Sequence, residues 1–199
     1  LRNGGLFFKV KSKQFPQGIK GLSVNIVNRY TAHKNINELG APKFGELVSI
    51  SDGVLWTRLT IPSKLDHINI YLIEDAGGWL AVDTGPDSDI NRKIWKKIVR
   101  NLPGIKKLSG LLVTHCHPDH IGLSGWMQNY FGIPVYISES EILKARNDEF
   151  NRLSGDHGRV EYFYKFMGVT SSELPEFKRD SQAIAHLYGA LPDQVEIFS

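Results

Sequence analysis

The chain contains one cysteine, two methionines and no apolar run of about 18 residues, the length a membrane-spanning helix needs. A single cysteine excludes an internal disulfide and fits a reducing compartment, so we expect a cytoplasmic protein. No membrane association is expected, because the apolar segment at residues 5–8 is also too short for a signal-peptide core. The 199 residues, 41% of them hydrophobic, suffice for one domain with a packed core.

Acidic residues are scarce at the start of the chain. Residues 1–45 contain eight Lys or Arg and one Asp or Glu, whereas residues 46–199 contain sixteen and twenty. A basic arm can bind nucleic acid or an anionic membrane. Residues 1–43 show neither helical nor alternating patterning, however, so we interpret them as a basic extension of unclear status. A solvated extension or a segment foreign to the native protein is favoured over a nucleic-acid interface.

From residue 44 onward, hydrophobic patterning predicts an α/β domain. Four short strands are expected in an antiparallel meander at one edge of a large sheet: residues 48–50, 54–59, 68–73 and 79–82. An amphipathic helix should follow and stop at Pro103-Gly104. Strand, helix, strand and helix are then expected at residues 111–114, 121–130, 135–137 and 140–147. An aromatic-rich segment at residues 160–167 fits core packing or a wall of a binding groove equally well.

The most informative segment is Thr114-His115-Cys116-His117-Pro118-Asp119-His120, which follows an apolar run. Histidine is the commonest protein ligand of zinc, and carboxylates suit divalent cations. If residues 111–114 form a strand, alternation places the side chains of His115 and His117 on the same side of the extended chain. Cys116 then points to the opposite face and is expected to be a small buried residue. Asp119 and His120 follow Pro118, where the chain turns toward a helix, and can face a second ion.

The pattern His-x-His-x-Asp-His resembles the signature of the metallo-β-lactamase superfamily, as does Asp83-Thr84-Gly85 at the end of an apolar strand. The resemblance implies an αββα four-layer sandwich with metals at the rim between its two sheets. Residues 44–199 would supply the N-terminal half of that domain, truncated at the C-terminus: chiefly the first sheet and its helices.

Each ion is expected to lack at least one protein ligand here, since a catalytic zinc typically takes three. In the family the missing partners come later in the chain: a third His, a bridging Asp and a final His. Beyond His120 the sequence offers only His157 and His186, and neither follows a strand into a glycine turn. We therefore expect the 199 residues alone to be incompetent for full catalysis.

The resemblance implies a hydrolase with two Zn²⁺ per complete domain, or alternatively Fe or Mn. His115 and His117 would hold one ion, and Asp119 and His120 the other. A metal-bound hydroxide would attack an ester, thioester, lactone or similar small acyl substrate, with Asp119 accepting a hydrogen bond from it. Asp83, at a neighbouring strand end, is expected to orient a ligating histidine; a purely turn-forming role is the alternative.

Three other interpretations stay open at this stage. A mononuclear-iron sulfur dioxygenase has the same fold and the same four-residue motif. A truncated metal-binding remnant without catalysis would explain the incomplete ligand set. A nucleic-acid processing enzyme of the superfamily is suggested by the basic extension alone. The sequence leaves the oligomeric state undetermined.

Overall fold

The computed structural model of the protein describes residues 40–104, 107–154, 158–176 and 185–198, so most of the basic extension and His157 lie outside the described residues. Seven strands form one sheet in the order of the chain. The strands are β1 (Val48–Ser51), β2 (Val54–Thr60), β3 (His67–Glu74), β4 (Trp79–Val82), β5 (Leu108–Leu112), β6 (Val135–Ser138) and β7 (Glu196–Phe198). The helices are α1 (Asp89–Arg100), α2 (Pro118–Ile121), α3 (Ser124–Phe131), α4 (Glu139–Ser154), α5 (Gly158–Phe166) and the 3₁₀ turn η2 (Ala185–Leu187).

The sheet is antiparallel in its first half and parallel in its second. β1 to β4 pair antiparallel and are joined by short turns, one of which uses Gly53 at φ 71°. β4 to β7 pair parallel, and parallel neighbours need a crossover, which the helices provide. The predicted meander and the strand–helix alternation that follows it are therefore confirmed.

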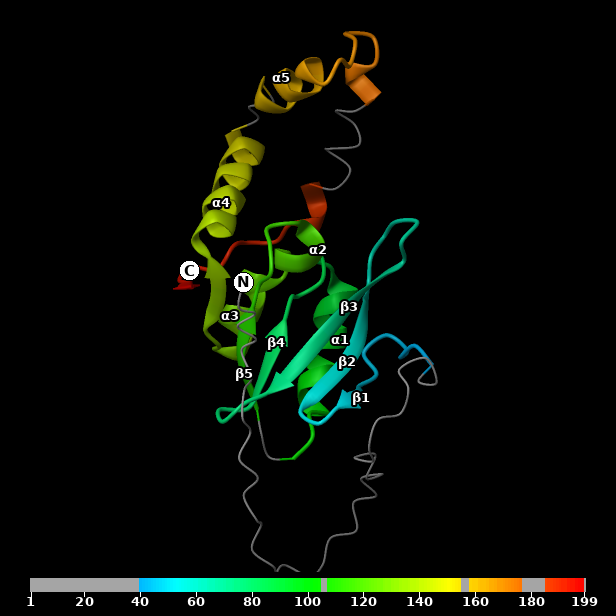
Figure 1. Cartoon of the computed structure of the whole chain (residues 1–199), viewed down its shortest axis with the longest axis vertical. Coiled ribbons are helices and arrows are strands. Elements are labelled where there is room, and N and C mark those ends of the chain that lie inside the picture. Colours follow the sequence, from blue (N-terminus) through cyan, green and yellow to red (C-terminus); the bar gives the residue numbers. More distant parts are fainter. Residues whose placement is uncertain (1–39, 105–106, 155–157, 177–184, 199) are drawn as a thin grey trace, which may run out of the picture.

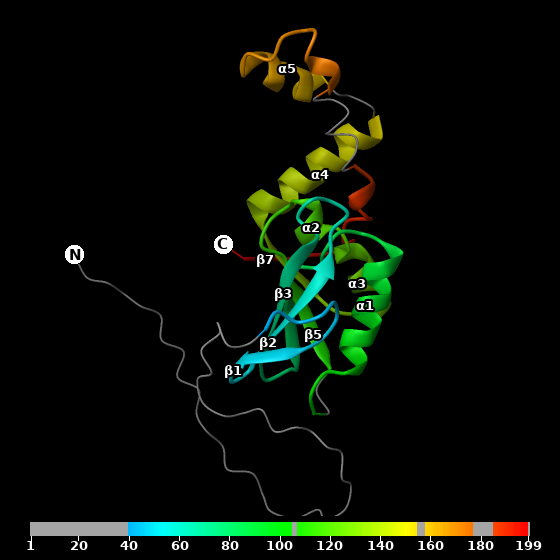
Figure 2. The same cartoon turned by 90° about the vertical axis from the view of Figure 1, so that its right-hand side faces the viewer.

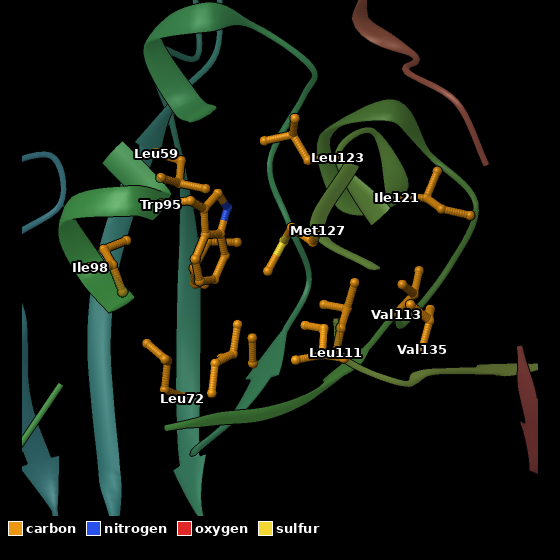
Figure 3. Close-up of a cluster of buried hydrophobic side chains, with 14 of the residues drawn as sticks. Leu59, Leu72, Trp95, Ile98, Leu111, Val113, Ile121, Leu123, Met127 and Val135 are labelled. Carbon is orange, nitrogen blue, oxygen red and sulfur yellow. The ribbon is translucent and has the colours of Figure 1, made fainter. Parts of the chain in front are cut away.

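Helices α1 and α3 cover one face of the sheet (Figures 1 and 2). β3 alternates buried and more exposed residues, as expected for a strand with helices on one side only. The core between the sheet and these helices contains Trp95 of α1 and Met127 of α3, both fully buried (Figure 3). The fold is thus α/β, with one sheet and its helices formed by the described residues.

The opposite face of the sheet carries apolar side chains that the described residues leave partly exposed. The strand register aligns one row of residues across five strands on this face: Trp56, Tyr71, Val82, Leu112 and Tyr136. Tyr71 and Tyr136 are 37% and 36% exposed. An exposed inner face is what we expect of half of a sandwich, and the described residues contain no second sheet.

Two predicted elements differ from the structure. The strand before the histidine motif runs from Leu108 to Leu112 and ends before Thr114, so His115 and His117 lie in a loop and not on an extended strand. The helix expected at residues 121–130 is divided into α2 and α3 around Gly122. Tertiary hydrogen bonds explain the division, because the Gly122 carbonyl accepts from Gly189 N and the Leu123 amide donates to a side chain outside the helix.

Helix α4 extends to Ser154, beyond the predicted end, and leads to α5 at the far end of the molecule from β1 (Figure 1). Tyr162 and Phe166 of α5 are 73% and 77% exposed, so core packing among the described residues does not explain this aromatic segment. Within the described part of the chain, no helix has both the length and the apolar character needed to cross a membrane.

Asn91 joins α1 to the strand end and the loop that lead to the candidate site. Its side chain is fully buried, and its Oδ1 accepts from Thr60 N at 3.1 Å and from Thr60 Oγ1 at 3.0 Å. Its Nδ2 donates to the carbonyl oxygens of Thr60 at 2.9 Å and of Pro86 at 3.0 Å. Helix α1 begins just before it, at the N-cap Ser88, whose hydroxyl accepts from the Asn91 amide.

We expect Asn91→Ala to lower the free energy of unfolding by about 1–3 kcal/mol, because it leaves the buried Pro86 carbonyl and the partly buried backbone groups of Thr60 without this partner. Urea denaturation followed by circular dichroism measures the change. Lys93→Ala, on the exposed face of the same helix, is the control and should change stability by less than about 0.5 kcal/mol. Equal stabilities of the two variants would contradict the role given to Asn91.

Candidate metal centre

The candidate residues meet at the carboxyl ends of two neighbouring parallel strands. β4 and β5 are paired in register, with Val82 opposite Leu112. Asp83 directly follows β4, and the histidine motif follows β5 after Val113 and Thr114 (Figure 1 shows the two strands side by side). Loops that leave the same edge of adjacent parallel strands lie close together, and such edges commonly carry the site in α/β proteins.

The Asp83 carboxylate connects the two loops. Its Oδ1 accepts a hydrogen bond from Thr114 N at 2.8 Å, and the Thr114 hydroxyl oxygen lies 3.0 and 2.9 Å from Oδ1 and Oδ2. His120 Nδ1 lies 2.8 Å from Oδ2. Asp83 has a backbone φ of 66°, a left-handed conformation that Asp adopts more readily than most residues. The sharp turn directs this carboxylate, only 6% exposed, toward the motif.

Thr84, the residue after Asp83, also connects the loop after β4 to the histidine motif. Its amide donates to the His120 carbonyl at 3.0 Å, and its hydroxyl accepts from the Leu123 amide at 3.0 Å. Its own carbonyl accepts a hydrogen bond from the buried indole of Trp95 at 2.7 Å. The backbone of α2, the helix that contains Asp119 and His120, is therefore connected to α1 through Thr84, which is fully buried.

The structure brings the four motif residues together as two pairs. His115 Nε2 and His117 Nδ1 are 3.1 Å apart, and Asp119 Oδ2 lies 3.4 Å from His120 Nε2. The two pairs are adjacent, because the rings of His115 and His120, one from each pair, have their centroids 3.9 Å apart. Although the motif does not continue the strand, the loop places these side chains side by side.

Hydrogen bonds to the remaining ring nitrogens favour the tautomers that a metal ligand needs. When the ring of His120 is neutral and donates Nδ1–H to Asp83, its lone pair is on Nε2, which faces Asp119. The Thr114 hydroxyl, when it donates to Asp83, can accept from Nδ1–H of His115 at 3.0 Å. That leaves the Nε2 lone pair of His115 toward His117. Carboxylates that orient ligating histidines in this way are common in metal sites.

The donor atoms form two pairs, and each pair could supply two of the ligands of one divalent ion. Two nitrogens bound to one tetrahedral zinc at 2.0–2.1 Å would be about 3.3 Å apart, close to the 3.1 Å between His115 Nε2 and His117 Nδ1. No group of three or more His, Cys, Asp or Glu among the residues that the structure describes forms a ligand set for one ion. His186, on η2, is exposed and belongs to no such group.

The charged groups and burial of the motif shift the pKa values of its two histidines in opposite directions. Burial alone would lower the pKa of His120, but hydrogen bonds to Asp119 and Asp83 outweigh it and raise this pKa to about 9. The pKa of His115 is lowered by burial and by the neighbouring His120 and His117. The pKa of Asp119 is lowered mainly by its hydrogen bond with His120. The charged form of His120 is therefore favoured between Asp119 and Asp83, and a cation bound at Nε2 would take the place of its proton.

Asp83→Asn tests the link between the two loops in chelator-treated protein. Asn tolerates a positive φ and retains the size of the side chain but removes its charge. We expect the pKa of His120 to fall from about 9 toward 6.5, measured by NMR titration of the ring protons. The stabilisation that the charged His120 contributes, full below pH 6.5 and lost as pH rises through 9, should shrink accordingly. An unchanged pKa would show that Asp83 does not act on His120.

Sequence reasoning missed several contacts of this centre. Thr114 was noted only as the start of the motif, and Thr84 only as a residue that shapes the loop after its strand, although both make hydrogen bonds that connect the two loops. The Cys116 amide donates to Glu141 Oε2, an interaction with helix α4 that spacing alone does not reveal. The expectation for the Cys116 side chain is confirmed: it is 2% exposed, and burial raises the pKa of its thiol.

Comparison with known proteins agrees with this geometry. A family model described as the metallo-beta-lactamase superfamily matches residues 64–195. The chain belongs to this superfamily. The match spans β3 to the segment before β7 and includes both Asp83 and the histidine motif, so the predicted family is confirmed.

Individual relatives cover parts of the chain. A protein described as a probable metallo-hydrolase, from Methanocaldococcus jannaschii, is 31% identical over 81 residues, which make up 41% of this chain and 37% of that protein. The crystal structure of a beta-lactamase domain protein from Burkholderia ambifaria is 27% identical, with a TM-score of 0.58 over 79% of this chain and 45% of that one.

A metallo-beta-lactamase family protein from Thermus thermophilus shares the fold, with a TM-score of 0.55 at 23% identity over 76% of this chain and 47% of its own. The chain thus spans less than half the length of each of these three relatives. This matches the sequence-based expectation that only part of the four-layer sandwich is present, and it agrees with the exposed inner face of the sheet.

Proposed function

We propose that the protein containing these residues is a metal-dependent hydrolase of an ester, thioester, lactone or similar small acyl substrate. The observation that carries the proposal is the convergence of four metal-type donors, in two pairs, at the ends of β4 and β5. Membership of a superfamily of metallohydrolases supports it. A cytoplasmic location, inferred from the single cysteine, belongs to the same proposal.

The two pairs suggest two ion positions. His115 through Nε2 and His117 through Nδ1 would hold one ion, and Asp119 and His120 would hold the other. Zinc is proposed for both, because imidazole with a carboxylate is a donor set typical of it. The remaining ligands would have to come from outside the described group of residues.

Zinc in such a site would lower the pKa of a bound water to about 7 and so supply a nucleophile at neutral pH. The chain's own residues would then orient the reactants. Asp119 is 31% exposed at its side chain, so its carboxylate can both contact solvent and accept a proton or a hydrogen bond. Asp83 and Thr114 would hold the rings of His120 and His115 in place throughout.

Zinc titration of His117→Ala tests the ion assignment. We expect affinity at the first position to fall by more than about 100-fold, because loss of an orienting partner alone typically costs 10–100-fold. Isothermal calorimetry against a competing chelator measures it. His67→Ala, a histidine of β3 hydrogen-bonded to Asp66, is the matched control and should bind zinc as the parent does. Equal affinities for the two variants would refute the assignment of His117.

Turnover tests the reaction class. The zinc-loaded full-length protein should hydrolyse at least one of an aryl ester, an acyl thioester and a lactone, and a chelator should abolish the activity. Asp119→Ala should reduce turnover by a factor of about 100 or more, since it loses a ligand and a proton acceptor together. Stoichiometric zinc without hydrolysis of any of the three substrates would contradict the acyl-hydrolase proposal but leave the metal centre intact.

A further inference from the structure

Cys116 separates the two histidines of the first pair, and helix α4 holds it at two points. The Cys116 amide donates to Glu141 Oε2 at 2.9 Å. Its sulfur accepts a hydrogen bond from Lys144 Nζ at 3.2 Å, and that ammonium group also pairs with Asp148 at 2.9 Å. All three α4 residues lie within about two and a half turns of the start of the helix, on the side that faces the motif loop.

The amide contact is informative because this loop has left the sheet. β5 ends at Leu112, so the Cys116 amide has no strand neighbour to pair with. A backbone amide that packs at the edge of a core needs an acceptor, and a carboxylate is a stronger one than a neutral group. Glu141, half-buried in the first turn of α4, provides it from 25 residues further along the chain.

The Cys116 amide is part of the backbone that joins the two neighbouring histidines. The amide belongs to the peptide plane that joins His115 to Cys116, and the next plane joins Cys116 to His117. The thiol is 2% exposed and confined by Lys144, so the residue is fixed at its backbone and at its side chain. In this arrangement His115 Nε2 and His117 Nδ1 are 3.1 Å apart.

The geometry points to Glu141 as a positioning residue for the first ion. By accepting the Cys116 amide, Glu141 sets the separation of His115 Nε2 and His117 Nδ1 before any ion binds. This inference rests on the proposed metal function but assigns a role to a helix and a residue outside the motif. Its chemistry is preorganisation: a donor pair already at its binding separation does not have to be ordered when the ion binds.

A role in helix stability alone is the competing explanation, because an acidic residue in the first turn interacts favourably with the helix dipole. Glu139 offers a matched control. It lies in the same first turn and carries the same charge, and its side chain is exposed. If the dipole were the whole explanation, Glu139→Ala and Glu141→Ala would behave alike.

The experiment compares Glu141→Ala, Glu141→Gln and Glu139→Ala in the full chain, each first checked for folding by circular dichroism. Zinc affinity by chelator competition should fall about 10–100-fold in Glu141→Ala and stay at the parent value in Glu139→Ala. Glu141→Gln retains an acceptor oxygen for the amide and should recover most of the affinity. Cobalt(II) substitution adds a spectroscopic readout, since its visible bands should change in Glu141→Ala and return in Glu141→Gln.

The possible outcomes distinguish failure of this inference from failure of the proposed metal function on which it rests. A full-length parent protein that binds neither zinc nor cobalt would overturn the metal function and this inference together. Normal metal binding by the parent, with equal affinity and equal cobalt spectra for Glu141→Ala and Glu139→Ala, would overturn only the role of Glu141. Amide exchange of Cys116, measured without metal, should be faster in Glu141→Ala than in the parent, and an unchanged rate would also count against the inference.

Discussion

The Asp83 carboxylate is the interaction on which the candidate site depends. It is almost fully buried, and it is compensated there by the Thr114 amide, the Thr114 hydroxyl and the His120 ring. A buried charge is stable only with such partners, so the two loops cannot separate without exposing it or leaving it unpaired. The hydrogen bonds of one carboxylate thus join residues that are 31 and 37 positions apart in the sequence.

The neighbouring strands and helices determine the position of the Asp83 carboxylate. Parallel pairing of β4 with β5 brings the two strand ends to one edge, and α1 supports the loop after β4 through Asn91 and Trp95. On the other side of the motif, α4 contacts Cys116. The histidine loop is therefore held between elements of regular structure, which suits a site whose donor atoms must stay within a few tenths of an ångström of a fixed separation.

Much of this arrangement was predictable because its signals are local. The short apolar runs that predict the strands, the three- and four-residue spacing of apolar residues in α1, and the dense clustering of imidazoles all depend on neighbouring residues. The apolar run at residues 68–73 also predicts a strand buried on both faces, and this is wrong, because β3 is covered by helices on one face only. The errors have long-range causes. The strand before the motif ends early because Asp83 accepts the Thr114 amide, and α2 separates from α3 because Thr84 and Gly189 bond to the backbone of residues 122 and 123.

The sequence by itself determined which chemical groups are present and in what order. Four candidate donors within six residues, after an apolar run and downstream of Asp-Thr-Gly, indicate the family and the chemistry of its candidate ligands. Only the tertiary structure decided which ring nitrogens face each other, which carboxylate orients which histidine, and that Glu141 holds the amide between them. The physical reason is that hydrogen bonds between distant segments depend on how strands and helices pack, and residue spacing within one segment does not contain that information.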